Sequence, residues 1–394
     1  MTAISAPLDP EPLDDPEDAG VPVDRLDALV ERARQMVEGS EQALESGQVA
    51  VARGGRLVRQ VTFGDASPVA RFNVFSVTKA FIAAAVWQLM GDGLVDPSDL
   101  VVDHVPEFGS NGKDVVTVEH LLTHTGGFPT APLGPPEWSS RQGRLDRFAQ
   151  WRLNWEPGSR MEYHPSSAHW VVAEIIERVT GRDFRDVVYE DVMAPLGLPR
   201  LRVGATDRHP DGWADVPPIR IVGEAPAPSE LEELMGFAID LSEVTDAAVL
   251  RFSEAEVRDL GVPGGGGIGS AGDVALFYQA LLHNAGDLWD PGILADGTGR
   301  IRCDQPDPML GVAANRSLGL TIAGDDGNAR RRGFGKTVSA RAFGHLGKGA
   351  QVAWADPHTG ISFCFLTNDH DVDLLAEGMR INSLNNRAGA LVHP

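Results

Sequence analysis

Cysteine is nearly absent from the sequence. The two cysteines, Cys303 and Cys364, lie far apart along the chain, which excludes a disulfide framework and a cysteine-rich metal site. Cys364 falls in the apolar run ISFCFL and is typical of a small, buried hydrophobic residue. The chain also lacks the basic start and apolar stretch of a signal peptide, and its longest apolar helical segment, 80–90, is too short to span a bilayer. We therefore expect a soluble, cytoplasmic protein.

Positive charge is also scarce. The chain has 34 Lys and Arg residues against 56 Asp and Glu, a formal net charge of −22. Such an acidic surface argues against binding nucleic acid or an anionic membrane, so we expect a small-molecule substrate as the partner. The oligomeric state is left open, with a homodimer among the alternatives. Lysine itself occurs only four times, at Lys79, Lys113, Lys336 and Lys348.

The remaining composition is that of an ordinary globular protein, in a chain too long for one simple core. The Pro- and Asp-rich residues 1–20 predict an extended arm. Hydrophobic periodicity predicts helices over 23–44, 76–90, 117–123, 166–180, 183–193, 229–236, 271–284 and 371–387. Short runs bounded by turn residues predict strands over 48–53, 56–64, 319–324, 339–347, 350–357 and 360–369. The first two of these strands form a hairpin around Gly54 and Gly55.

Strands near both ends of the chain, with helices between them, predict an α+β or α/β sandwich fold. Its antiparallel sheet would be built from both termini and flanked by helices. Residues 21–90 and 290–394 would form this sheet domain, and residues 91–289 a mostly helical insertion. We expect the active site to lie between the two.

Ser76-Val77-Thr78-Lys79 opens an apolar helical segment. Residues three apart share a helical face, so Lys79 can reach the Ser76 hydroxyl, which is a poor nucleophile until a base takes its proton. Burial and the helix N-terminus both lower a lysine pKa, so a neutral Lys79 could be that base. The alternative is a solvated helix start with an incidental lysine, which the apolar surroundings of Lys79 make less attractive.

Two further segments could supply partners. Tyr163 lies between a Pro157-Gly158 turn and a predicted helix, and a tyrosine beside a lysine can shuttle a proton to a leaving group. Its alternative is a core tyrosine. His345 lies among glycines in 343–349, where an edge strand lets a substrate approach and backbone N–H groups can stabilise an oxyanion. Its alternative is a glycine-rich turn with an incidental histidine.

In this order along the chain, the three segments resemble the serine β-lactamase and penicillin-recognising superfamily, and within it the class C β-lactamase-like esterases, or family VIII carboxylesterases. The resemblance runs from about residue 20 to the end and includes LLTHTGG at 121–127, PGGGGIGSAGDVALF at 263–277 and WADPHTGISFCFLTN at 354–368. It implies a β-lactamase-like fold with Ser76 as nucleophile, Lys79 as base and Tyr163 as proton relay. It also implies an oxyanion hole made by the N–H groups of Ser76 and Lys348, beside the substrate-binding strand His345-Leu346-Gly347.

Two departures from the family pattern bear on the substrate. The β-lactamases carry Lys-Thr-Gly, whose Lys and Thr contact a substrate carboxylate, where this chain has His345-Leu346-Gly347. Lys336-Thr337 is no replacement, since Val338 follows and the pair lies on the wrong side of the strand pattern. The family often shows Tyr-x-Asn, where this chain has Tyr163-His164-Pro165. The first departure predicts weak β-lactam hydrolysis. The second predicts weaker binding of peptide-like substrates and favours an ester or a small amide.

We therefore expect a serine hydrolase that forms an acyl-enzyme and needs no cofactor, with His345 orienting Tyr163 or the substrate. The alternatives are an acyltransferase, an amidase or D-amino-acid peptidase, and a binding module that has lost the chemistry. His120 and His124 are four residues apart, but HExxH and a third ligand are missing, so we expect no metal site. Phosphate-loop and GxSxG spacings are also missing, so the sequence supports neither a nucleotide enzyme nor an α/β-hydrolase.

Overall fold

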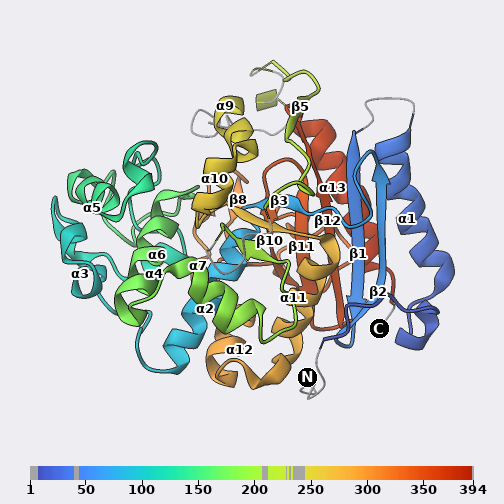
Figure 1. The fold of residues 1–394 in the computed structure, drawn as a ribbon, viewed down its shortest axis with the longest axis horizontal. Coiled ribbons are helices and arrows are strands. Elements are labelled where there is room, and N and C mark those ends of the chain that lie inside the picture. Colours follow the sequence, from blue (N-terminus) through green and yellow to red (C-terminus); the bar gives the residue numbers. More distant parts are fainter. Residues whose placement is uncertain are drawn as a thin grey trace.

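A six-stranded sheet joins the two ends of the chain (Figure 1). The computed structural model describes residues 8–39, 44–205, 212–227, 229, 232–233 and 245–392. The strands are β1 (Ser46–Arg53), β2 (Arg56–Gly64), β9 (Thr321–Ile322), β10 (Phe343–Gly347), β11 (Gln351–Asp356) and β12 (Ile361–Thr367), in the order β2-β1-β12-β11-β10-β9. All neighbours are antiparallel, and Gly47 of β1 faces Thr367 of β12. The predicted hairpin and the predicted sheet from both termini are confirmed.

Helices cover both faces of this sheet. Val49 and Val51 of β1 pack in one apolar cluster with α1 (Val23–Glu38) and α13 (Leu374–Gly389). The alternating residues Ala50 and Ala52 belong to the opposite cluster, together with α11 (Ala271–His283). Cys364 is fully buried in that second cluster, which confirms its predicted place in the core. The period of two along β1 thus assigns its side chains to two cores.

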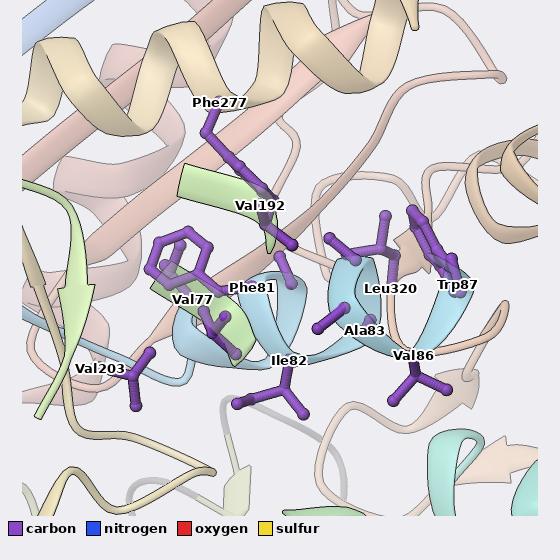
Figure 2. Close-up of a cluster of buried hydrophobic side chains, with 14 of the residues drawn as sticks. Val77, Phe81, Ile82, Ala83, Val86, Trp87, Val192, Val203, Phe277 and Leu320 are labelled. Atoms are coloured by element: carbon purple, nitrogen blue, oxygen red, sulfur yellow. The ribbon is translucent and has the colours of Figure 1, made fainter. Parts of the chain in front are cut away.

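Helix α2 (Thr78–Gly91), which follows the predicted nucleophile, is buried on all sides. Figure 2 shows its apolar side chains meeting residues from other elements, among them Val192, Phe277 and Leu320. The Phe81 and Phe277 rings meet edge to face, with centroids 4.9 Å apart. A helix that is apolar all round is stable only when buried, so the α2 sequence fixes the start of this helix deep in the protein.

The middle of the chain is mostly helical, and its first helices, over 101–180, lie on the other side of α2 from the hairpin (Figure 1). It contains the helices α3 (Val101–His104), α4 (Val118–Leu122), α5 (Arg141–Gln150), α6 (Ser167–Thr180), α7 (Phe184–Val187), α9 (Asp246–Leu250) and α10 (Ala255–Leu260). A small sheet, in the order β3-β6-β4, is formed by β3 (Phe72–Phe75), β4 (Arg202–Val203) and β6 (Gly267–Gly269). The remaining elements are β5 (Arg220–Val222), α12 (Pro291–Gly299), β7 (Pro306–Asp307), β8 (Val312–Ala313) and β13 (Asp369–Asp371).

Several predicted bounds shift. The helix predicted over 23–44 ends at Glu38, because Gly39 leaves the helical conformation. The 183–193 segment starts as α7 and continues as a π-helix over Val188–Met193. The strand predicted over 339–347 begins at Phe343, since the Ser339 N–H and hydroxyl bond to Asp356 instead. The last helix begins at Leu374, after β13. The helix predicted over 229–236 lies largely outside the described residues.

The predicted division into an arm, a sheet domain and an insertion at 91–289 stays a prediction. Helix α11 falls inside the predicted insertion, yet its residues share an apolar cluster with β1 and β12. Near the start of the chain, Asp9 pairs with Gly55 and Leu57 at the end of the hairpin. In the ranges that the structure describes, every helix is too short or too polar to cross a membrane.

Candidate active site

Ser76 lies in a tight turn between β3 and α2. The preceding residue, Phe75, has a φ of 45°, a left-handed conformation that costs a bulky residue on the order of 1–3 kcal/mol. Thr78 holds this turn, because its hydroxyl donates to the Phe75 carbonyl and accepts the Gly267 N–H at 2.8 Å. The Phe75 ring packs edge to face on Phe252, with centroids 5.3 Å apart. Neighbouring elements thus hold a strained backbone that presents Ser76.

Lys79 is fully buried one turn after Ser76. Its Nζ atom lies 3.2 Å from Ser76 Oγ and donates to the carbonyls of Pro165, at 2.8 Å, and Gly264, at 2.7 Å. A neutral amine has two N–H donors and one lone pair, so these contacts leave the lone pair for the Ser76 hydroxyl. Burial, and then the charge of Arg316, hold the pKa of Lys79 well below its usual value. Lys79 is therefore equipped to be a base.

Tyr163 packs against Lys79, whose Nζ lies 5.0 Å from the centroid of the tyrosine ring. Burial raises the pKa of Tyr163 to about 12, while Arg316 and the nearby Ser76 side chain oppose this rise. In the described chain, the Tyr163 hydroxyl makes no hydrogen bond of standard geometry. A buried, protonated phenol beside Ser76 is suited to donate a proton, and its hydroxyl is free to turn toward a substrate.

Strand β10 brings the third predicted segment to the same place. The His345 ring lies 6.1 Å from the Tyr163 ring, between centroids. Its Nδ1–H donates to Leu346 O at 2.6 Å, and its Nε2 accepts from Arg316 at 3.2 Å. Burial, then Arg316 and Lys79, hold the pKa of His345 well below its usual value, so the ring is neutral. The Leu346 side chain packs on the α1 and α13 face instead.

Gly347 and Lys348 complete this segment beside the turn that carries Ser76. A Cβ atom on Gly347 would lie 2.4 Å from the Val74 carbonyl oxygen, so only glycine lets β10 approach β3 this closely. Lys348 follows in the turn to β11. Throughout the described ranges, the backbone N–H groups of Ser76 and Lys348 find no acceptor. Both groups are therefore available to an oxyanion, the role that the resemblance implies for them.

The structure adds residues that sequence reasoning missed. The His124 ring lies 4.6 Å from the Tyr163 ring, and His124 Nδ1 accepts the His164 N–H at 3.1 Å. His169 is also fully buried nearby, with its ring centroid 5.9 Å from that of His124. Burial is the first cause that lowers the pKa of all three histidines, so they surround Lys79 and Tyr163 without adding charge. His124 lies in the LLTHTGG segment, but no spacing rule connects it to Tyr163.

Arg316 is the other missed residue. It precedes β9, and its Cζ lies 5.3 Å from the Tyr163 ring centroid. The sequence gives no signal for it, because thirty arginines follow no pattern that separates this one from the rest.

The Lys336-Thr337 pair and His120 lie apart from this group. The Lys336 N–H donates to Asn386 Oδ1 at 2.6 Å, and the Thr337 hydroxyl donates to Asn386 O at 2.9 Å, so this pair contacts α13. His120 Nδ1 accepts the Thr117 N–H at 3.2 Å and caps α4. Among the described residues, no group of three His, Cys, Asp or Glu side chains could hold a metal ion.

Comparison with known proteins identifies the family of the chain. Residues 26–385 match the β-lactamase family. The esterase EstB of Burkholderia gladioli is 31% identical over 330 residues, covering 76% of this chain and 79% of its own. The esterase/β-lactamase LipL of Mycobacterium tuberculosis is 29% identical over 320 residues, covering 75% of this chain and 68% of its own. The crystal structure of a penicillin-binding protein homologue from Caulobacter crescentus superposes with a TM-score of 0.75 at 26% identity, covering 95% of this chain and 99% of that one. The chain therefore belongs to the β-lactamase family.

Proposed function

We propose that the chain is a carboxylesterase, of the EC 3.1.1 type, that forms an acyl-enzyme at Ser76 and accepts small amides less well. One observation carries this proposal: the buried Lys79 Nζ lies 3.2 Å from Ser76 Oγ, and its other hydrogen bonds among the described residues go to two backbone carbonyls. The relatives that are named as esterases, among them EstB, support the assignment to esters.

Acylation begins when Lys79 Nζ accepts the Ser76 hydroxyl proton and Ser76 Oγ bonds to the ester carbonyl carbon. The carbonyl oxygen becomes an oxyanion, which the N–H groups of Ser76 and Lys348 stabilise. As the bond to the leaving alcohol breaks, Tyr163 donates its proton to the leaving oxygen. Tyr163 then recovers a proton from the Lys79 ammonium, which leaves an acylated Ser76 and a neutral Lys79.

Deacylation repeats these steps with water. A water molecule attacks the acyl carbonyl while its proton passes to the Tyr163–Lys79 pair. The bond to Ser76 Oγ breaks, Ser76 recovers its proton, and the acid leaves. The assignment of base and acid follows from the two environments, because burial lowers the pKa of Lys79 and raises that of Tyr163 to about 12.

The substrate class follows from the residues around this centre. At the positions of the β-lactamase Lys and Thr, His345 has both ring nitrogens engaged and Leu346 faces the opposite side of β10. Pro165 offers only a carbonyl, which already accepts from Lys79. A substrate carboxylate and a peptide carbonyl both lose their usual partners here, so we propose a neutral ester as the preferred substrate.

The test compares Ser76→Ala with the wild type on a short-chain nitrophenyl ester, an anilide of the same acyl group and a chromogenic cephalosporin. We expect the wild type to favour the ester, to turn over the anilide slowly and the cephalosporin least. Ser76→Ala should lower kcat/KM by about 10⁴-fold or more and prevent the acyl adduct from being detected by intact mass. The exposed Ser98→Ala variant is the control. Undiminished turnover by a folded Ser76→Ala protein would refute the proposal.

A further inference from the structure

Arg316 differs from the other buried arginines of the described chain. Arg71 and Arg332 each face a carboxylate, Asp215 and Asp326. The Arg258 guanidinium donates to three backbone carbonyls, and Arg202 Nε donates to the Pro199 carbonyl at 2.9 Å. Arg316 is only 6% exposed, yet the hydrogen bond of its guanidinium is to the neutral ring of His345, and its Nε has no partner. A cation left buried without a carboxylate is costly, which points to a role beyond stability.

The position of Arg316 is fixed from two sides. Its backbone N–H donates to Cys303 O at 2.8 Å, and its carbonyl accepts the Cys303 N–H at 3.0 Å. At the other end, Arg316 Nη1 lies 3.2 Å from His345 Nε2. Because His345 Nδ1 donates to Leu346 O at 2.6 Å, its other nitrogen carries a lone pair toward the guanidinium. His345 thus holds Arg316 against Tyr163.

Tyr163 consequently lies near two cationic side chains. Lys79 Nζ is 5.0 Å and Arg316 Cζ is 5.3 Å from the centroid of its ring, so the two nitrogen-bearing groups are at most about 10 Å apart. An arginine stays charged at every pH where a protein folds. Its charge therefore acts constantly on Lys79, where it repels the ammonium form, and on Tyr163.

We propose that Arg316 is a positioning residue for the reaction at Ser76, and that its buried charge keeps Lys79 in the free-amine form. In this role it supplies a positive charge that the neutral His345 ring cannot. The inference rests on the proposed function, because it assigns to Arg316 a task in preparing the same base.

The other groups around Lys79 and Tyr163 do not provide this charge. They are four histidines and one carboxylate: His124, His164, His169, His345 and Asp307. Burial lowers the pKa of each histidine, so all four are neutral near pH 7. The charge of Asp307 raises the pKa of Tyr163, whereas that of Arg316 lowers it. One Asp307 oxygen accepts the Met309 N–H at 2.8 Å. Arg316 is the permanent cation of this group.

The test measures how the rate of Ser76 labelling by an uncharged alkyl fluorophosphonate depends on pH, followed by intact mass. The rate rises with pH as Lys79 loses its proton. Two charges about 10 Å apart at an effective dielectric constant of about 20 shift a pKa by about one unit. In Arg316→Met we therefore expect this rise to move about one pH unit higher. Labelling should then be about tenfold slower at a pH below the rise and should approach the wild-type rate above it.

Two further variants and a pair of ester substrates make the outcome decisive. Arg316→Gln repeats the test if Arg316→Met does not fold. Arg332→Met removes another buried arginine, and its labelling profile should stay in place even if its stability falls. Turnover of a neutral ester is compared with that of a matched ester carrying a carboxylate. A profile that does not move in Arg316→Met overturns the inference, and a loss confined to the carboxylate ester would show instead that Arg316 binds substrate. An unlabelled wild type would refute the proposed function itself.

Discussion

Two buried lysines show how residue-level chemistry depends on the neighbour as well as on burial. Lys113 donates to the carbonyls of Ser110 and Trp151, both at 2.6 Å, and burial lowers its pKa to about 8. Lys79 is bound by two carbonyls in the same way, but it also has Ser76 Oγ 3.2 Å away. Burial favours a free amine at both positions, and only Lys79 has a hydroxyl to deprotonate.

This contrast predicts the effect of changing each lysine. Lys79→Arg keeps a positive charge but cannot accept a proton, so we expect it to lower kcat/KM as severely as Lys79→Met, by about 10³-fold or more. Lys113→Met should retain activity while losing about 1–3 kcal/mol of stability, because the Ser110 and Trp151 carbonyls each lose a charged donor and keep only the Lys113 N–H and the Asn111 amide. Nitrophenyl ester kinetics and chemical unfolding measure both effects. An active Lys79→Arg enzyme would exclude Lys79 as the base.

Site residues that belong to short sequence motifs can be predicted from the sequence. Site residues that are brought together only by the tertiary structure cannot. Ser76 and Lys79 are three apart on one helix, so their proximity follows from local geometry. Tyr163 and His345 come from distant segments, and only the family pattern connects them to the serine. Arg316 reaches Tyr163 from the loop before β9. Nothing in the local sequence marks Arg316. Its proposed role depends on the absence of a carboxylate partner and on contact with the Tyr163 ring, and both arise only in the folded chain.

At the scale of elements, the contact between β10 and β3 sets the width of the proposed oxyanion hole. A Cβ atom on Gly347 would lie 2.4 Å from Val74 O, so Gly347→Ala must push β10 away from the strand that leads to Ser76. The Lys348 N–H would move with it. Since a displaced oxyanion donor costs about 10²–10³-fold in rate, we expect kcat to fall by about 10²-fold or more, with KM changing less.

A matched glycine tests whether this loss is local. Gly378 lies in α13, and a Cβ there would meet no other atom within 4 Å. Gly378→Ala should keep full activity and gain up to about 1 kcal/mol of stability, since alanine is the better helix former. Full kcat in a folded Gly347→Ala enzyme would mean that the close approach of β10 to Val74 has no part in catalysis.

Among the elements, strongly apolar periodic segments are predictable, whereas a short helix with three glycines is not. The predicted helices over 166–180 and 271–284 agree with α6 and α11 within a residue. Helix α12, which the sequence did not predict, contains Gly292, Gly297 and Gly299. A Cβ on Gly297 would lie 2.4 Å from the Trp87 ring, so this helix exists because it packs closely on α2. A helix that is stabilised by tertiary packing cannot be predicted from the helix propensity of its own residues.

At the scale of the whole molecule, the C-terminal helix supports the turn that carries Lys348. Glu377 of α13 accepts the Ala350 N–H at 3.2 Å, and Ala350 has the left-handed φ of 64°. Burial raises the pKa of Glu377 to about 7, although the charge of Lys348 opposes the rise. His370 lies 3.9 Å away from Glu377, and burial lowers its pKa to about 4. The strand positions along the sequence predicted a sheet from both ends, but not this contact between α13 and the β10–β11 turn.

Glu377 and His370 give opposite slopes to the dependence of the free energy of unfolding on pH. A carboxyl whose pKa is raised on folding stabilises the protein fully below its unfolded pKa, and this contribution is lost as the pH rises through the folded value. For Glu377 the window runs from 4.5 to about 7. A histidine whose pKa is lowered contributes above its unfolded pKa, and for His370 the loss occurs as the pH falls from 6.5 toward about 4.

Glu377→Gln isolates the carboxyl contribution, because the amide oxygen can still accept the Ala350 N–H. We expect wild type and variant to have similar free energies of unfolding near pH 4, where Glu377 is protonated in both states. Near pH 8 the variant should be more stable by at most about 3 kcal/mol, an upper value because the Glu377 side chain is 13% exposed. Urea unfolding at a series of pH values measures the difference, with the exposed Glu254→Gln as control. Parallel curves for wild type and Glu377→Gln would show that Glu377 is ionised without cost in the folded protein.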